Sequence, residues 1–329
     1  MNSTNFLTFE GQLDLLESRG MIISDREKAL KKIETIGYYK IKGFAYALVK
    51  PENCTQDYKN VSFEGVKFDE VILRYYQDKN LRSYILHAIE KIEVAVKVRI
   101  AYVLGGNYGA FGYKNFSKWT DRNRFSQNER RSKETKFSDE LRDKITRSAL
   151  SDLNNREDLD SDGLPSIWLA VDVLTFGDIV YLLNLMSIKN IEEVSKSFNL
   201  DKDKFLSWMY CLKFIRNLCA HNSNIIDVKL RTTPKKINDW DNYLYQNTSG
   251  KITNRIAIVI MIINYFISKI NPQYRFQSIY QSLNKMISRT DIKATAMGFK
   301  NYKAFQKACP LKKRHKHFKM KQNQVASLQ

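Results

Sequence analysis

Apolar side chains recur every three or four residues from Phe68 to Leu104. This spacing places them on one face of an α-helix, so the pattern predicts a single long helix. The glycine-rich stretch GGNYGAFGY at 105–113 is expected to end that helix as a turn. A glycine-rich loop can also bind phosphate, but such loops precede a helix and contain a Lys-Ser or Lys-Thr pair, which this stretch lacks.

Helix boundaries are also marked before this segment. Ser24 or Asp25 suits the N-cap of a helix over about residues 26–36, and Gly37 suits its end. The aromatic-rich stretch YYKIKGFAYALV that follows fits either a short helix or an extended segment. A polar loop at 51–65 comes next, and we expect a domain boundary close to it.

Three further helices are expected in the second half of the chain. Residues 163–186 combine core-forming apolar positions with Pro165, which suits the first turn of a helix. Another helix begins near Lys202 and carries the segment FIRNLCAHNSNIID. The apolar run IAIVIMIINYFI at 256–267 is shorter than the roughly 20 residues that span a bilayer, so it predicts a buried helix.

These patterns together predict an all-α protein. Glycine and proline are scarce, at 13 and 5 residues in a chain of 329, and this composition favours long helices. We expect an N-terminal helical region at 1–66 and a helical bundle at 67–270, with a basic insertion at about 114–162. A basic C-terminal region follows at 271–329.

The chain has 54 Lys and Arg against 35 Asp and Glu, a net charge of +19. This excess indicates a polyanionic partner, nucleic acid before an anionic membrane. The alternative is a lysine-rich composition that reflects an AT-rich genome. No apolar signal core precedes the first helices and no C-x-x-C pair occurs, so we expect a cytoplasmic protein without membrane association or a zinc ribbon. No metal or other cofactor is expected, since lysines surround the pair His315 and His317.

Basic residues gather in three places that are candidates for RNA binding. In the insertion they alternate with Phe116, Trp119 and Phe125, which suits single-stranded RNA because charges meet phosphates and rings stack on unpaired bases. A solvated helix with paired Glu and Arg is the alternative. The candidate residues are Arg122, Arg124, Arg130, Arg131 and Lys133 in the insertion, Lys229, Arg231, Lys235 and Lys236 further along, and Lys312, Lys313, Arg314 and Lys316 in the tail.

One segment, Phe214–Asp227, combines an arginine, an asparagine and a histidine with apolar residues. Asn217 and His221 share a helix face, whereas Arg216 and His221 lie about 140° apart around an ideal helix. They converge only if the helix ends or kinks between them, or if a substrate or second subunit bridges them. Arg binds phosphate and His moves protons, so the pair could cleave RNA through its own 2′-hydroxyl. A buried cluster that caps the helix is the alternative.

The sequence RNLCAH resembles the R-x(4–6)-H signature of the HEPN superfamily. More closely, four stretches in order resemble the Abi-like family of bacterial abortive-infection proteins, of the AbiD/AbiF type. Together these stretches span about residues 10–230. They are LLESRGMIISDREKALKKIETIGYYKIKGFAYAL, YQDKNLRSYILHAIEKIEVAVKVRIAYVLGGNYGAFGY, PSIWLAVDVLTFGDIVYLL and FIRNLCAHNSNIID.

The resemblance implies a HEPN bundle, often dimeric, that acts as a metal-independent endoribonuclease and leaves 2′,3′-cyclic phosphate and 5′-hydroxyl ends. It implies a toxin-like role in phage defence, and in some relatives an associated structured noncoding RNA. Carried over by position, Arg216 would bind the phosphate, His221 would be the general acid or base, and Asn217 would orient them. Many relatives have a second histidine and a basic residue where this chain has Asn222 and Asn224. We therefore expect a homodimer in which the second protomer supplies the missing group.

Two acidic residues of the long predicted helix are candidate partners of the site. Glu90 or Glu93 could face Arg216, although pairing with Lys97 on the helix surface is the alternative. Two other functions stay open: an RNA-binding protein that does not cleave, and a DNA-binding regulator, for which the chain shows no clear recognition helix.

Overall fold

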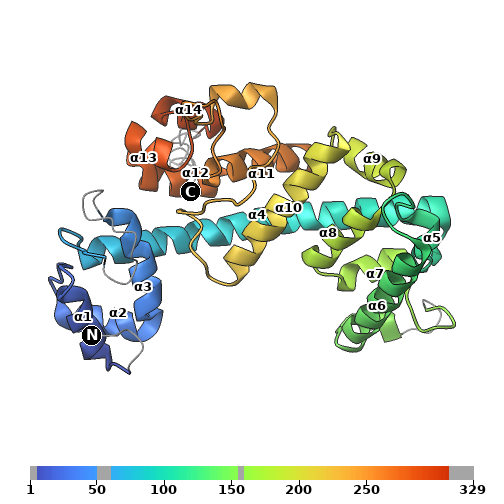
Figure 1. The fold of residues 1–329 in the computed structure, drawn as a ribbon, viewed down its shortest axis with the longest axis horizontal. Helices are drawn as coiled ribbons and strands as arrows, with labels where there is room; N and C mark the ends of the chain where they lie inside the picture. The colour runs from blue at the N-terminus through green and yellow to red at the C-terminus, as the bar shows by residue number, and fades with distance from the viewer. Residues whose placement is uncertain (1–5, 50–60, 155–158, 311–329) are drawn as a thin grey trace, which may run out of the picture.

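The computed structural model describes residues 6–49, 61–154 and 159–310. Its central element is helix α4, Phe68–Tyr108, which runs along most of the length of the molecule (Figure 1). The long helix predicted from the apolar spacing is therefore confirmed. The helix continues through the first two glycines of the expected turn and ends at Tyr108. Gly109 follows as its C-cap, with a φ of 81° in the left-handed region that favours glycine.

Three short helices gather at the N-terminal end of α4: α1, Phe9–Glu17; α2, Arg26–Ile36; and α3, Tyr38–Ala45 (Figure 1). The predicted limits of α2 are confirmed. The carboxylate of Asp25 accepts a hydrogen bond from the backbone N–H of Lys28 at 2.9 Å, and Gly37 follows the last helical residue. The aromatic-rich stretch that the pattern left open is helical and continues as a 3-10 turn, Tyr46–Leu48.

Five helices gather at the other end of α4: α5, Phe116–Trp119; α6, Gln127–Thr146; α7, Ile167–Val173; α8, Phe176–Leu185; and α9, Ile188–Lys196 (Figure 1). The segment predicted as one helix over 163–186 is therefore two helices. Thr175 begins the second one, because its hydroxyl accepts from the Asp178 N–H at 3.3 Å and the Asp178 carboxylate accepts from the Thr175 N–H at 2.7 Å.

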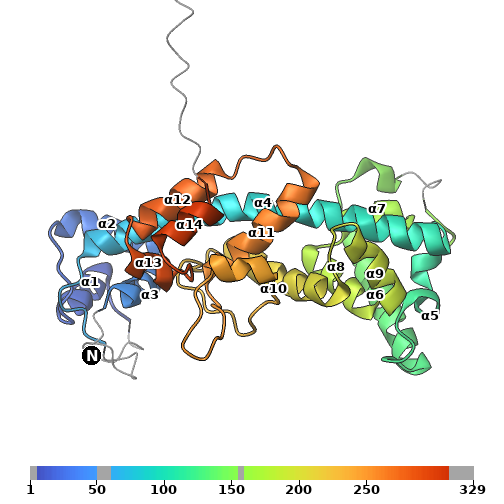
Figure 2. The same ribbon diagram turned by 90° about the horizontal axis from the view of Figure 1, so that it is seen from above.

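Helix α10, Lys202–Ala220, crosses α4 in the view of Figure 1. Four helices follow it: α11, Ile256–Ile270; α12, Gln277–Ile287; α13, Asp291–Ala296; and α14, Tyr302–Ala308 (Figure 2). Most of α11 is buried, as the apolar run predicted. The all-α class is confirmed, since the described residues form fourteen α-helices and only isolated β-bridges. None of these helices is both long enough and apolar enough to cross a membrane.

Buried apolar side chains form two clusters within the described residues. The smaller cluster joins α1, α2 and α3 to the start of α4, as far as Ile72. The larger cluster begins at Leu81 and includes side chains of α10, α11, α12 and α14. Between the two clusters, α4 carries the fully buried carboxylate of Asp78. The limits of the three expected regions stay a prediction.

Candidate active site

Helix α10 ends at Ala220, immediately before the histidine of the segment Phe214–Asp227. Its last turn is closed by two backbone hydrogen bonds, from Asn222 N–H to the Cys219 carbonyl at 3.2 Å and from Ser223 N–H to the Leu218 carbonyl at 2.8 Å. This pattern is a Schellman motif, which places a left-handed residue just beyond the helix end. Asn222 occupies that position with a φ of 55°, a conformation that asparagine tolerates better than most residues.

The three candidate catalytic side chains lie on two sides of α10, Asn217 and His221 on one and Arg216 on another. Asn217 and His221 are exposed, and Arg216 is partly buried, so the alternative of a buried capping cluster is wrong. The helix is continuous up to Ala220, and no kink brings Arg216 and His221 together. The ideal helical spacing of about 140° between their directions is therefore not removed by a bend in the helix. The Arg216 side chain has no hydrogen-bond or ion-pair partner among the described residues.

The chain that follows His221 is anchored to α4 by a buried carboxylate. Asp78 accepts hydrogen bonds from the backbone N–H groups of Ile225 at 2.9 Å and Ile226 at 3.0 Å. It also forms a buried ion pair with Arg82, one turn further along α4. Arg82 in turn donates to the Ser223 carbonyl at 3.3 Å. These contacts hold the end of α10 in a defined position on the long helix.

A second set of polar contacts surrounds this anchor. Asp227 forms an ion pair with Arg74 of α4, and its carbonyl accepts from Arg255 at 3.1 Å. The Asn224 side-chain oxygen accepts a hydrogen bond from the Asp227 N–H at 3.1 Å, and its amide N–H donates to the Asp227 carboxylate at 2.8 Å. Asn222 and Asn224 thus have structural roles, Asn222 in the helix end and Asn224 in the loop.

The residues that position this helix end were not predicted from the sequence. Asp78 and Arg82 are four residues apart and resemble an ordinary surface pair on a helix, yet they are 0% and 3% exposed. A usable signal was their place in the helical pattern, since Asp78 and Arg82 share a helix face with the core residue Ile85. Lys40 of α3 was also missed, and its ammonium donates to the Asn222 carbonyl at 2.7 Å.

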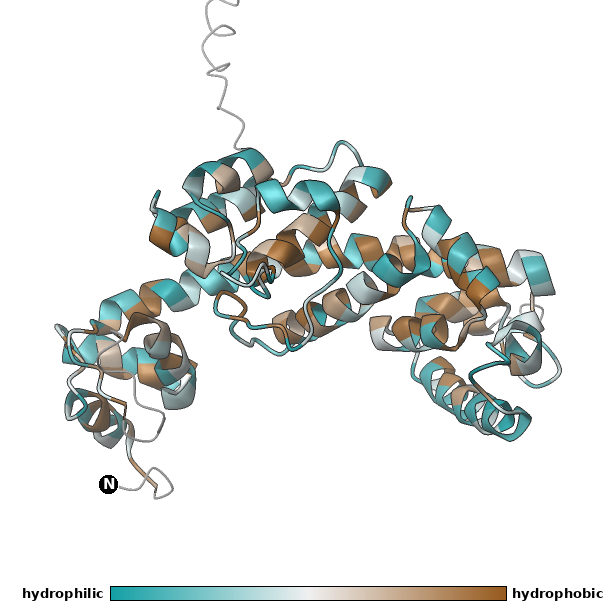
Figure 3. Cartoon of the chain, turned by 45° about the horizontal axis from the view of Figure 1, so that its top comes forward, coloured by the Kyte–Doolittle hydropathy of each residue, from teal (hydrophilic) through white to brown (hydrophobic). Residues whose placement is uncertain are grey.

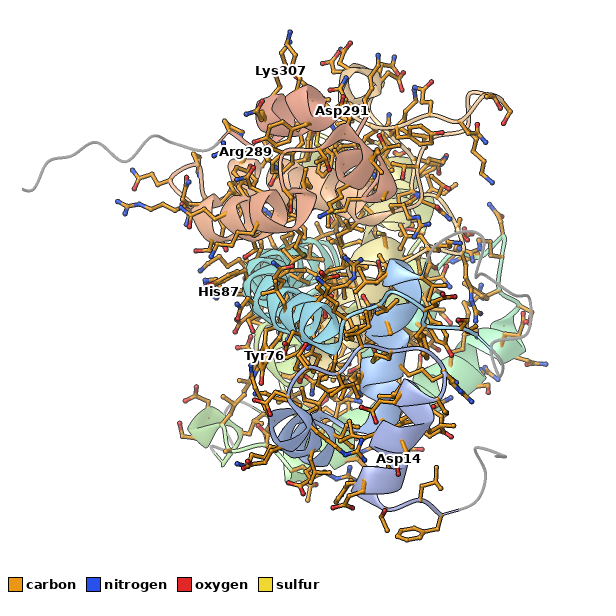
Figure 4. The ribbon with its side chains drawn as sticks, turned by 90° about the vertical axis from the view of Figure 1, so that its left-hand side faces the viewer. Asp14, Tyr76, His87, Arg289, Asp291 and Lys307 are labelled. Carbon is orange, nitrogen blue, oxygen red and sulfur yellow. The ribbon has the colours of Figure 1, made fainter. Side chains whose placement is uncertain are left out.

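Neither Glu90 nor Glu93 forms a hydrogen bond or ion pair with Arg216. Glu93 forms the i,i+4 pair with Lys97, at 3.3 Å, that was the alternative interpretation. Glu90 is exposed and lies 3.8 Å from His87 Nδ1. The His87 ring is 6.1 Å from the ring of Tyr274, and Figure 4 shows His87 on α4 near the C-terminal helices.

The basic insertion is folded around its own aromatic residues. Phe116 and Trp119 are 0% and 1% exposed, so the prediction that they stack on RNA bases is wrong. They are buried because α6 packs against α5. The rest of α6 is almost entirely hydrophilic (Figure 3). Phe125 is partly buried, and Lys133 Nζ lies 5.2 Å from the centre of its ring.

Three of the five candidate RNA-binding residues in the insertion donate to backbone carbonyls. Arg122 donates to Ser117 and Arg124 to Asn184, each at 3.0 Å. Arg130 likewise donates to the carbonyl of Phe125 at 3.0 Å. These contacts fix the guanidinium groups near the surface and leave the side chains of Arg122 and Arg124 exposed. Arg131 is also exposed on α6.

The four basic candidates after α10 fall into two groups, one with ion-pair partners and one without. Lys235 Nζ lies 3.0 Å from Asp203, and Lys236 pairs with Asp241. Lys229 and Arg231 are exposed and form no ion pair with any residue that the structure describes. The tail candidates, Lys312, Lys313, Arg314 and Lys316, lie outside the described residues.

Residues that bind metals or act as nucleophiles are not grouped near α10. No group of three His, Cys, Asp or Glu side chains in the described ranges could hold a metal ion. Cys211 and Cys219 lie on the buried side of α10, where burial raises the pKa of each thiol to about 12. Neither thiol is therefore a nucleophile at neutral pH.

The fold and site define an all-α protein whose central helix anchors a second helix ending in an exposed histidine. A family model described as Abi-like protein matches residues 31–227, from α2 to the end of the anchored loop. The chain belongs to the Abi-like protein family, and this membership points to a role in abortive infection. No curated protein and no solved structure matched the chain.

Proposed function

We propose that this protein is an RNA-binding HEPN protein, a metal-independent endoribonuclease that acts as an abortive-infection toxin and is held by a structured noncoding RNA. The observation that carries the proposal is the end of α10, where exposed Asn217 and His221 share a face and Arg216 lacks an internal partner. Family membership supports the biological role and is consistent with a nuclease. The net charge of +19 supports a polyanionic substrate.

The chemistry requires one phosphate-binding group and two proton transfers. A base takes the proton from the RNA 2′-hydroxyl, whose oxygen attacks the adjacent phosphorus. The bond from phosphorus to the 5′-oxygen breaks, and an acid protonates the leaving oxygen. The products are a 2′,3′-cyclic phosphate and a 5′-hydroxyl. Arg216 neutralises the charge on the non-bridging oxygens, and His221 is the acid or the base.

A second protomer completes this arrangement. Within one chain, Arg216 and His221 point in different directions and His221 is the one histidine of the segment Phe214–Asp227. If two α10 ends lie on opposite sides of the RNA, one protomer can supply the arginine and both can supply a histidine. This explains how a chain with Asn222 in place of a second histidine can still transfer two protons.

The test is cleavage of RNA by purified protein in the presence of a chelator. We expect His221→Ala to abolish cleavage while retaining the helical circular dichroism spectrum and thermal transition of the wild type. The matched control is His87→Ala, which removes the exposed histidine of α4. The product ends are then analysed for cyclic phosphate and 5′-hydroxyl. Cleavage by His221→Ala at the wild-type rate would contradict the proposal.

A non-catalytic RNA-binding function is the second candidate. One observation favours it. Asn222 adopts the left-handed conformation that ends the helix, so His221 is the single histidine at the site of each chain. To separate the two functions, the gene is expressed together with its flanking intergenic DNA, the protein is purified, and the RNA that copurifies is sequenced. One discrete RNA that stays intact with the wild type and His221→Ala alike supports binding alone.

A further inference from the structure

Two large side chains are exposed on the same face of α10 as the candidate catalytic histidine. Tyr210 and Phe214 are 43% and 40% exposed. With Asn217 and His221 they lie within about 60° around the helix axis, at positions 0, 4, 7 and 11 of one row. We call these four residues the α10 stripe. Buried residues such as Leu212 occupy the opposite face, so the stripe is directed away from the core.

Positive charges border the α10 stripe along its length. Lys213 Nζ lies 5.8 Å from the centre of the Tyr210 ring. Burial raises the pKa of Tyr210, and the positive charge of Arg124 opposes that shift. At the other end, Lys40 donates to the Asn222 carbonyl. No Asp or Glu occurs from 204 to 226, so α10 beyond its first turn has no negative side chain.

We propose that Tyr210 and Phe214 stack on unpaired bases of a single-stranded RNA that runs along α10 toward His221. This proposal rests on the proposed function and adds two features: the RNA is single-stranded, and its path follows α10. Exposed rings beside cations are the arrangement by which proteins hold single-stranded RNA, because rings contact bases while cations contact phosphates. The helix rise places the two ring positions about 6 Å apart and His221 about 10 Å beyond Phe214.

The charges favour RNA over a second copy of the chain as the occupant of the stripe. If two copies met stripe to stripe, the cations of one stripe, such as Lys213, would approach a surface of the other copy in which α10 has no acidic residue beyond its first turn. Such like-charge contacts oppose association. A strand of RNA between two protomers neutralises these cations and still allows each protomer to present His221. The stripe also differs from the buried rings of Phe116 and Trp119, which no base can reach.

The test uses full-length wild-type protein freed of nucleic acid, with a short labelled 2′-fluoro single strand as probe, because this RNA lacks the attacking hydroxyl. We expect Phe214→Leu and Tyr210→Leu each to weaken binding about tenfold, the lower part of the range for loss of one stacked base. Phe214→Trp retains a ring and should bind as the wild type does. Tyr245→Leu, which makes the same change at an exposed tyrosine outside α10, is the matched control and should leave affinity unchanged.

Each other result has a distinct meaning. If the wild type binds the single strand and Phe214→Leu binds it equally well, the stacking proposal is overturned while the proposed function stands. If the wild type binds neither single-stranded nor duplex RNA, the proposed function fails as well. If Phe214→Leu changes the molar mass in solution and leaves RNA affinity intact, the stripe is an interface between copies and the stacking proposal is wrong. Crosslinking of 4-thiouridine RNA to Tyr210 or Phe214 supports the proposal directly.

Discussion

The carboxylate of Asp78 on α4 accepts a hydrogen bond from the backbone N–H of Ile225, 147 residues further along the chain, at 2.9 Å. This bond joins the longest helix to the loop that follows His221. Because Asp78 also pairs with Arg82, the carboxylate accepts three hydrogen bonds while fully buried. A buried charge is tolerated when its partners satisfy it in this way. The site on α10 therefore depends on residues far from it in sequence.

We predict that Asp78→Ala lowers the free energy of unfolding by about 3–5 kcal/mol, because Arg82 is left buried without its counter-charge and two N–H groups lose their acceptor. Chemical denaturation followed by circular dichroism measures the change. Asp78→Asn keeps an acceptor oxygen and should lose less. The control is Glu27→Ala, which breaks an exposed i,i+4 pair with Lys31 and should alter stability little. Equal midpoints for Asp78→Ala and the control would show that the anchor is unimportant.

The left-handed conformation of Asn222 makes a prediction about substitution there. Asn222→Gly should unfold at the wild-type temperature, since glycine adopts a φ of 55° without strain. Asn222→Val should lose about 1–2 kcal/mol, because the branched side chain clashes in that conformation. Differential scanning calorimetry compares the two variants. A valine variant as stable as the glycine variant would argue against the Schellman motif at this helix end.

Two adjacent glycines of α4 should respond to alanine in opposite ways. A Cβ at Gly105 would lie 2.8 Å from the Trp168 ring, so Gly105→Ala should destabilise the protein by about 1 kcal/mol or more. Gly106 has open space at the same position, so Gly106→Ala should stabilise it by about 0.5–1 kcal/mol through helix propensity. Thermal unfolding of both variants measures the difference. Shifts in the same direction would contradict the close approach of α7 to α4.

The cysteines provide a prediction about reactivity. Cys211, Cys219 and Cys309 are buried, and burial raises the pKa of each thiol. In a Cys54→Ser variant, we therefore expect no reaction with Ellman's reagent at neutral pH until denaturant is added, after which three thiols react. Cys54 lies outside the described residues. A fast reaction of any thiol in the native protein would show that α10 or α14 opens readily.

Local patterns determined much of the fold by themselves. The spacing of apolar residues predicted α4, and the cap residues Asp25 and Gly37 predicted the limits of α2, because a helix depends on contacts within a few residues. The break at Thr175 was missed although its signal was local, since a Thr followed three residues later by Asp begins a capping box.

For the site, the chain by itself indicated that Arg216, Asn217 and His221 belong together, and it predicted that Arg216 and His221 diverge around the helix. Tertiary structure decided the rest. Burial depends on which surfaces meet, so it separated Phe116 and Trp119, which form core, from Tyr210 and Phe214, which are exposed. The tertiary structure also placed Asp78 against the loop after His221. The sequence could not predict this contact, because a long-range hydrogen bond leaves no periodic pattern.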